Sequence, residues 1–110
     1  MNPALQRVRA DLLARLEELR SARSDTKDDR APIELDQTSV GRLSRMDSLQ
    51  QQAMAAAVDK RRHDEIKRIE AALRRIDEDE YGYCVQCGEA IAPARLELDL
   101  TIPTCINCAR

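Results

Sequence analysis

The chain has 110 residues, a formal net charge of −2 and 35% charged residues, with three Gly, four Pro, two Tyr and neither Phe nor Trp. This length accommodates one small domain and excludes a multidomain enzyme. The charge balance lacks the excess of Lys and Arg that drives phosphate binding, so nucleic acid is a weak candidate partner and a nucleic-acid-binding finger is the third hypothesis. Many charges and few glycines are typical of exposed helices, which predicts a mainly α protein.

The sequence contains no run of about 18 apolar residues, and its N-terminus is polar. We therefore expect a cytoplasmic protein without a membrane partner. In the reducing cytoplasm, the four cysteines are expected to bind a metal rather than to form disulfides.

Residues 3–23 are predicted to form the first helix. Apolar side chains recur there at steps of three and four, which places them on one helical stripe. They are Leu5, Val8, Leu12, Leu16 and Leu19. Pro3 suits a first helical turn because its missing N–H would be unpaired there in any case. Residues 24–36 contain five acidic side chains, Pro32 and no apolar period, so they are predicted to form an acidic loop.

Residues 37–80 carry a second helical pattern without proline and with one glycine, Gly41. Its last apolar side chains follow heptad-like steps. They are Ile66, Ile69, Leu73 and Ile76. Neither helix buries its stripe alone, so we expect residues 1–80 to form an antiparallel hairpin, in effect a short coiled coil, with the acidic loop at its tip and its register left open. The acidic run at 77–80 opposes the helix dipole, which predicts either a basic neighbour, with Arg95 as the candidate, or an earlier helix end.

The last segment, residues 81–110, contains two Cys-x-x-Cys pairs separated by 17 residues. The four cysteines are Cys84, Cys87, Cys105 and Cys108. This spacing predicts tetrahedral coordination of one Zn²⁺, with Gly88 supplying the positive φ that the turn after the first pair requires. Four thiolates leave no position for water, so the ion is expected to be structural rather than catalytic. A redox-active pair and another metal are the alternatives.

No other catalytic constellation is visible. His63 is the single histidine and lies between Arg62 and Asp64, so we expect a solvated helix residue. The surrounding stretch is rich in Lys and Arg, which indicates either a solvated face or a docking surface for an acidic or phosphate-bearing partner. Without an open metal site or a nucleophile paired with a base, enzymatic activity is not expected.

The segment Asp-Glu-Tyr-Gly-Tyr-Cys-Val-Gln-Cys-Gly-Glu-Ala-Ile, followed by Ala-Arg-Leu-Glu and Cys-Ile-Asn-Cys, closely resembles the DksA/TraR zinc-finger family. The resemblance covers about residues 66–108. It implies a four-cysteine finger on a helical hairpin that binds bacterial RNA polymerase. It further implies that the acidic tip reaches the active centre through the secondary channel and alters initiation without binding promoter DNA, often together with ppGpp.

In longer members of the family, the tip of the hairpin carries the motif Asp-x-x-Asp-x-Ala, and the resemblance implies that the acidic loop is the corresponding segment here. This chain has Asp25-Thr-Lys-Asp28 and, later, Asp36. Asp36 is the first choice for the tip carboxylate, and helix capping is the alternative role for it. Asp25 and Asp28 are the further candidates.

Other candidate contacts to a partner are Arg61, Arg68 and Arg95. Arg68 matches a basic helix position of the family's alarmone pocket. Asp99 and Ala109 stand where that pocket draws basic residues, which argues against a response to ppGpp. A zinc-ribbon adaptor that contacts a different protein through its hairpin is the rival hypothesis.

Overall fold

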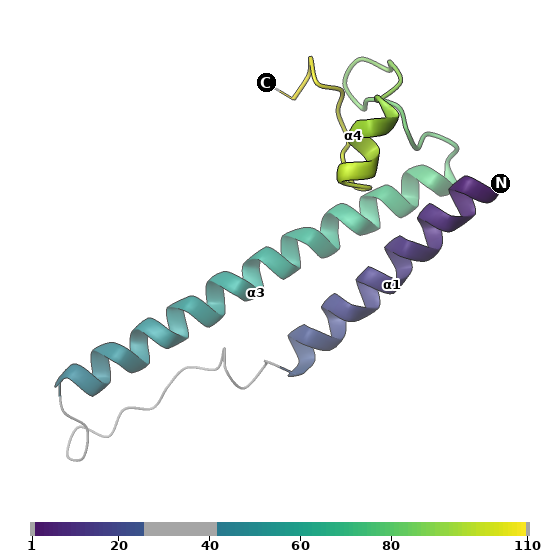
Figure 1. The fold of residues 1–110 in the computed structure, drawn as a ribbon. Coiled ribbons are helices and arrows are strands. Elements are labelled where there is room, and N and C mark those ends of the chain that lie inside the picture. The colour runs from purple at the N-terminus through teal and green to yellow at the C-terminus, as the bar shows by residue number, and fades with distance from the viewer. Residues whose placement is uncertain (1, 26–41, 110) are drawn as a thin grey trace.

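The computed structural model describes residues 2–25 and 42–109. Two long helices, α1 (Pro3–Asp25) and α3 (Arg42–Asp77), run antiparallel, and a small module containing the short helix α4 (Pro93–Leu98) sits at one end of the pair (Figure 1). The molecule measures 62 × 29 × 20 Å. The mainly α fold with a helical hairpin and a C-terminal four-cysteine module is thus confirmed, while the boundary between residues 80 and 81 stays a prediction. In the described part of the chain, no helix is long and apolar enough to cross a membrane.

A side-chain cap begins α1. The Oδ1 of Asn2 accepts a hydrogen bond of 2.7 Å from the N–H of Leu5, which satisfies one of the amides left unpaired at a helix start. Pro3 occupies the first helical position, as predicted. Asn2 was not predicted as a cap, and the helix ends at Asp25, two residues beyond the predicted end at residue 23.

The core lies between α1 and the C-terminal half of α3. Seven buried residues form it, all of them apolar: Leu12, Leu16, Leu19, Ile66, Ile69, Ala72 and Ile76. Ile69 and Ile76 are each 1% exposed. The predicted apolar stripes of the two helices therefore face each other. This packing fixes the register between α1 and α3, which the sequence had left open.

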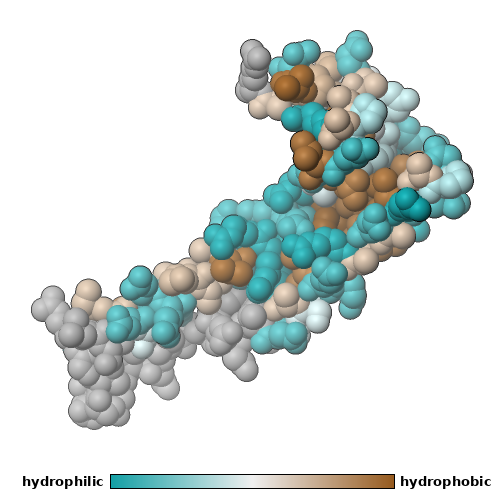
Figure 2. Space-filling view, viewed as in Figure 1, coloured by the Kyte–Doolittle hydropathy of each residue, from teal (hydrophilic) through white to brown (hydrophobic). Residues whose placement is uncertain are grey.

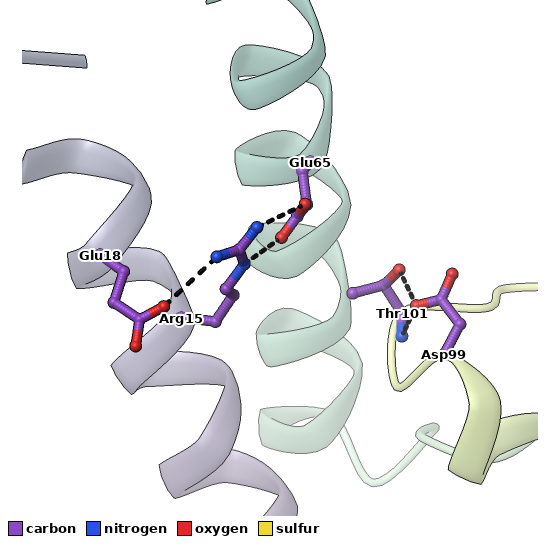
Figure 3. A network of polar contacts seen from close by, with 5 residues as sticks. All are labelled: Arg15, Glu18, Glu65, Asp99 and Thr101. Carbon is purple, nitrogen blue, oxygen red and sulfur yellow. Dashed lines mark hydrogen bonds and ion pairs between the residues drawn. The ribbon is translucent and has the colours of Figure 1, made fainter. Parts of the chain in front are cut away.

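Two arginines of α1 reinforce the register by bidentate contacts with carboxylates of α3. Arg15 donates from Nε and Nη2 to the two oxygens of Glu65 at 2.6 and 3.2 Å (Figure 3). Arg23 donates from Nε and Nη2 to Asp59 at 2.7 and 3.2 Å. The Nη1 of Arg23 also lies 3.2 Å from Nδ1 of His63, so His63, which was expected to be a solvated helix residue, is half-buried and has a side-chain partner on α1. Because a guanidinium only donates, Nδ1 of His63 accepts this hydrogen bond.

A change of backbone direction ends α3 at Asp77 rather than at Glu80. Asp79 has a φ of 58°. The N–H of Glu80 donates to the carbonyl of Arg75 at 2.8 Å, and the N–H of Asp79 donates to that of Ile76 at 3.2 Å. This pair of bonds is the Schellman motif, which requires a left-handed residue in the position of Asp79. The predicted helix end at residue 80 is therefore wrong. Of the two alternatives predicted for the acidic run, the structure adopts the earlier helix end.

The acidic run is not neutralised by Arg95, whose Nε donates to the carbonyl of Thr104 at 3.1 Å. Instead, the Nε of Arg9 in α1 lies 3.8 Å from Asp77. Both members of this pair are exposed, so it contributes little to stability.

Replacing Asp79 by glycine is expected to stabilise the protein by about 1 kcal/mol. Glycine adopts the left-handed conformation without the steric penalty of a Cβ, and the change removes a negative charge from the helix C-terminus. Urea unfolding of the zinc-loaded protein measures the effect, with Glu78→Gly as the matched control. The control is expected to leave stability unchanged or to lower it by up to about 1 kcal/mol. A loss of stability in Asp79→Gly would contradict this description of the helix end.

Candidate metal centre and the surfaces around it

Two tight turns present the cysteines. The N–H of Cys84 donates to the carbonyl of Glu89 at 2.8 Å, and the N–H of Gly88 donates back to the carbonyl of Cys84 at 2.9 Å. Gly88 has a φ of +77°, so its predicted role in the first turn is confirmed. In the second turn, the N–H of Cys108 donates to the carbonyl of Cys105 at 3.1 Å. Each turn thereby directs two sulfurs toward the same point.

The four sulfurs meet in one cluster. All four Sγ atoms lie within 4.8 Å of one another, and those of Cys87 and Cys105 are 3.6 Å apart. A tetrahedral Zn²⁺ with bonds of about 2.3 Å places its sulfur ligands about 3.8 Å from each other. None of the four cysteines is in a disulfide. The cluster therefore fits one structural zinc ion.

Local hydrogen bonds determine how easily the sulfurs ionise. Burial raises the pKa of Cys84, but the backbone N–H groups of Cys105, Cys87 and Gln86 together outweigh it and lower that pKa to about 6. Hydrogen bonds with the other three thiols raise the pKa of Cys108 to about 12. The four sulfurs thus do not all ionise near neutral pH by themselves, and a divalent cation supplies the missing compensation.

Residues 79–110 match the family model of the prokaryotic dksA/traR C4-type zinc finger. This module is a DksA/TraR zinc finger. The family match over residues 79–110 and the sulfur cluster together confirm the predicted finger and its predicted structural zinc.

Curated relatives match a segment of 43 residues of the chain. The RNA polymerase-binding transcription factor DksA of Haemophilus influenzae is 49% identical over 43 residues, which are 39% of this chain and 30% of that protein. The protein of the same name from Escherichia coli K12 is 42% identical over 43 residues, covering 39% and 28%. The matched segment thus spans less than one third of these relatives.

A solved structure resembles the chain as a whole. The transcription factor DksA2 from Pseudomonas aeruginosa superposes with a TM-score of 0.78 and 23% identity, covering 99% of this chain and 83% of that one. The DksA/TraR finger and the hairpin therefore occur together in a known fold.

Polar contacts attach the DksA/TraR finger to the hairpin. Tyr81 donates from its hydroxyl to the carbonyl of Leu100 at 2.8 Å, and both residues pack against the core. Burial raises the pKa of Tyr81, as expected for a phenol in an apolar contact. Arg75 reaches the carbonyl of Thr101 at 3.4 Å, and Thr101 donates from N and Oγ1 to Asp99 at 2.9 and 2.7 Å (Figure 3). These contacts orient the finger against α3.

The far end of the hairpin includes one of the three predicted tip residues. The C-terminal end of α1 and the N-terminal end of α3 lie away from the finger (Figure 1). Asp25 is the last residue of α1 and is exposed. Asp28 and Asp36 lie outside the described residues.

The three arginines predicted as partner contacts are not brought together. Arg61 and Arg68 are exposed on α3, and each lines a different cavity of about 390 Å³. Arg95 is half-buried and lines a third cavity on the finger. Arg68, the residue that matches the family's alarmone pocket, shares its cavity with Asp99. A carboxylate therefore lies beside the position where that pocket would be.

Proposed function

We propose that the chain binds bacterial RNA polymerase and regulates initiation from within the secondary channel. The carrying observation is the slender antiparallel hairpin that projects from a DksA/TraR finger (Figure 1). Curated relatives that match 39% of the chain are named RNA polymerase-binding transcription factors. Such a partner places the protein in the cytoplasm.

The dimensions of the hairpin suit this role. An α-helix with its side chains is about 10–12 Å across, so two packed helices form a narrow rod. The finger widens one end of the molecule (Figure 1) and would limit how far the rod enters. A carboxylate at the leading end then approaches the catalytic Mg²⁺ or the mobile elements beside it. We assign this role to Asp36, with Asp25 and Asp28 as the further candidates.

The proposed protein is a regulator without catalytic activity of its own. Arg61 and Arg68 are proposed to contact acidic groups of the polymerase, and Arg95 is proposed to contact the polymerase from the finger. No contact to promoter DNA is required. The cavity of Arg68 also contains Arg15, which is paired with Glu65, and the carboxylates of Asp11 and Asp99. Among the described residues, its two basic and three acidic side chains leave a net negative charge, which disfavours a pyrophosphate. The effect on initiation is therefore expected to be the same with and without ppGpp.

Asp36→Asn is expected to bind polymerase like the wild type but to leave the lifetime of polymerase–promoter complexes unchanged. The substitution removes the charge at nearly constant size, so it separates the proposed tip chemistry from docking. Promoter-complex lifetimes and in vitro transcription measure this effect. Asp29→Asn, another loop carboxylate, is the matched control and is expected to regulate like the wild type. Full regulation by Asp36→Asn would remove the tip role from this residue.

An adaptor function is the second candidate, because the polymerase-binding relatives match only 39% of this chain. More than half of the chain lies outside that match, and for this part the assignment of the partner rests on the fold alone. A pull-down with zinc-loaded protein distinguishes the two functions. Recovery of polymerase subunits supports the regulator, whereas recovery of a different protein without them supports the adaptor.

A further inference from the structure

An apolar groove of about 870 Å³ lies on the finger, apart from the core of the hairpin. Ala92, Ala94 and Leu98 from the α4 region and Ile106 from the second turn line it. Leu98 is 88% exposed and Ile106 is 67% exposed. Figure 2 shows hydrophobic surface on the finger in addition to the hydrophobic band along the helices. Large aliphatic side chains grouped in this way gain free energy when another surface covers them.

The groove is also negatively charged. Three of the zinc cysteines form one of its walls, and a divalent ion leaves the four-thiolate site with a net charge of about −2. Glu89 adds a further negative charge. Among the described residues that line the groove, Arg95 is the one basic side chain, and its Nε is engaged by Thr104. An occupant must therefore be apolar and basic at the same time.

We propose that this groove docks a protein segment with apolar side chains flanked by Lys or Arg. Resting on the proposed function, we assign the segment to RNA polymerase. The apolar side chains of the segment cover Leu98 and Ile106. Its N–H groups donate to the thiolate sulfurs and to Glu89 in charge-assisted hydrogen bonds. Nucleic acid is excluded as the occupant because its phosphates are repelled by the same charges.

The consequence is attachment at two points. The groove lies on the finger, at the opposite end of the molecule from the leading end of the hairpin (Figure 1). Binding at the groove raises the effective concentration of the hairpin at its own site. Loss of the groove contact therefore weakens the complex without changing the hairpin.

Leu98→Lys and Ile106→Lys test the groove in the full zinc-loaded chain. Each is expected to weaken binding to core RNA polymerase by about tenfold, because an apolar contact is lost and a basic partner is repelled. Val85→Lys is the matched control: Val85 is also on the finger and 59% exposed but lines a different cavity. It is expected to change affinity by less than about twofold. Zinc content and circular dichroism confirm that each variant is folded.

A peptide titration gives a readout that does not require the polymerase. The probe is an amphipathic helical peptide with Leu on one face and Lys on the other, and its control carries Glu at every Lys. In NMR spectra of the zinc-loaded chain, the basic peptide is expected to shift the amide signals of residues 89–98 and 105–108, and the acidic peptide is not.

The two experiments separate the possible failures. If the groove variants bind polymerase as tightly as the wild type, the docking role of the groove is overturned and the proposed function stays in place. Absence of any polymerase complex would refute the proposed function, and the peptide titration alone would then decide the groove. Equal shifts with both peptides would overturn the charge argument. If the chain self-associates and Ile106→Lys abolishes this association, the occupant of the groove is a second copy of the chain. That result would overturn the assignment to polymerase.

Discussion

Removal of zinc is expected to unfold the finger, residues 81–109, while α1 and α3 remain packed. In that segment, the buried residues are only Cys84, Ile91 and Thr101, which is too little apolar surface to hold it together. Structural zinc supplies about 10–16 kcal/mol of apparent free energy in small finger modules, so its loss exceeds any other single effect.

Hydrogen exchange with and without a chelator measures this effect residue by residue. The amides of the finger are expected to lose protection, and those facing the core between α1 and α3 are expected to keep it. Cys84→Ser should reproduce the result without a chelator, and Val85→Ser, one residue away and 59% exposed, is the matched control. A finger that stays protected after the metal is removed would refute the structural role of zinc.

Ile69→Ala is expected to lower the free energy of unfolding by about 2–5 kcal/mol. Ile69 is 1% exposed and lies in the cluster that joins α1 to α3. Truncation removes buried methyl groups and leaves a cavity that packed helices close only in part.

Urea unfolding at saturating zinc measures the loss of stability. Leu49→Ala is the control on the same helix, since Leu49 is 52% exposed, and it is expected to cost less than about 1 kcal/mol. Equal losses in the two variants would show that α1 does not pack on α3 as described.

Most of the residues that pack the hairpin were predictable from spacing alone, but Ala72, which is 0% exposed in the core, was not among them. Leu12, Leu16 and Leu19 were predicted to share one stripe, and all three are buried together with Ile69 and Ile76. Local periodicity determines which face is apolar, but not which turn of the partner helix it meets. That choice depends on pairs far apart in the chain, as between Arg15 and Glu65.

The metal centre was predictable because two short turns define it. The junction and the groove were not, since they arise only when the finger is placed against the hairpin. Tyr81 offered one signal, as one of two tyrosines in the chain, because a phenol usually finds a hydrogen-bond partner when buried. The exposed Leu98 and Ile106 gave no signal, because exposure of a single aliphatic residue is common.

Site-specific photo-crosslinking tests the central claim most directly. A photoreactive residue at Ser24, near the end of α1 away from the finger, is compared with one at Ala4, about 30 Å away along the same helix. Both positions are exposed. In the complex with RNA polymerase, Ser24 is expected to crosslink inside the secondary channel near the active centre, and Ala4 to crosslink at its outer rim. Crosslinks from Ser24 to the outer surface of a complex that does form would contradict insertion of the hairpin.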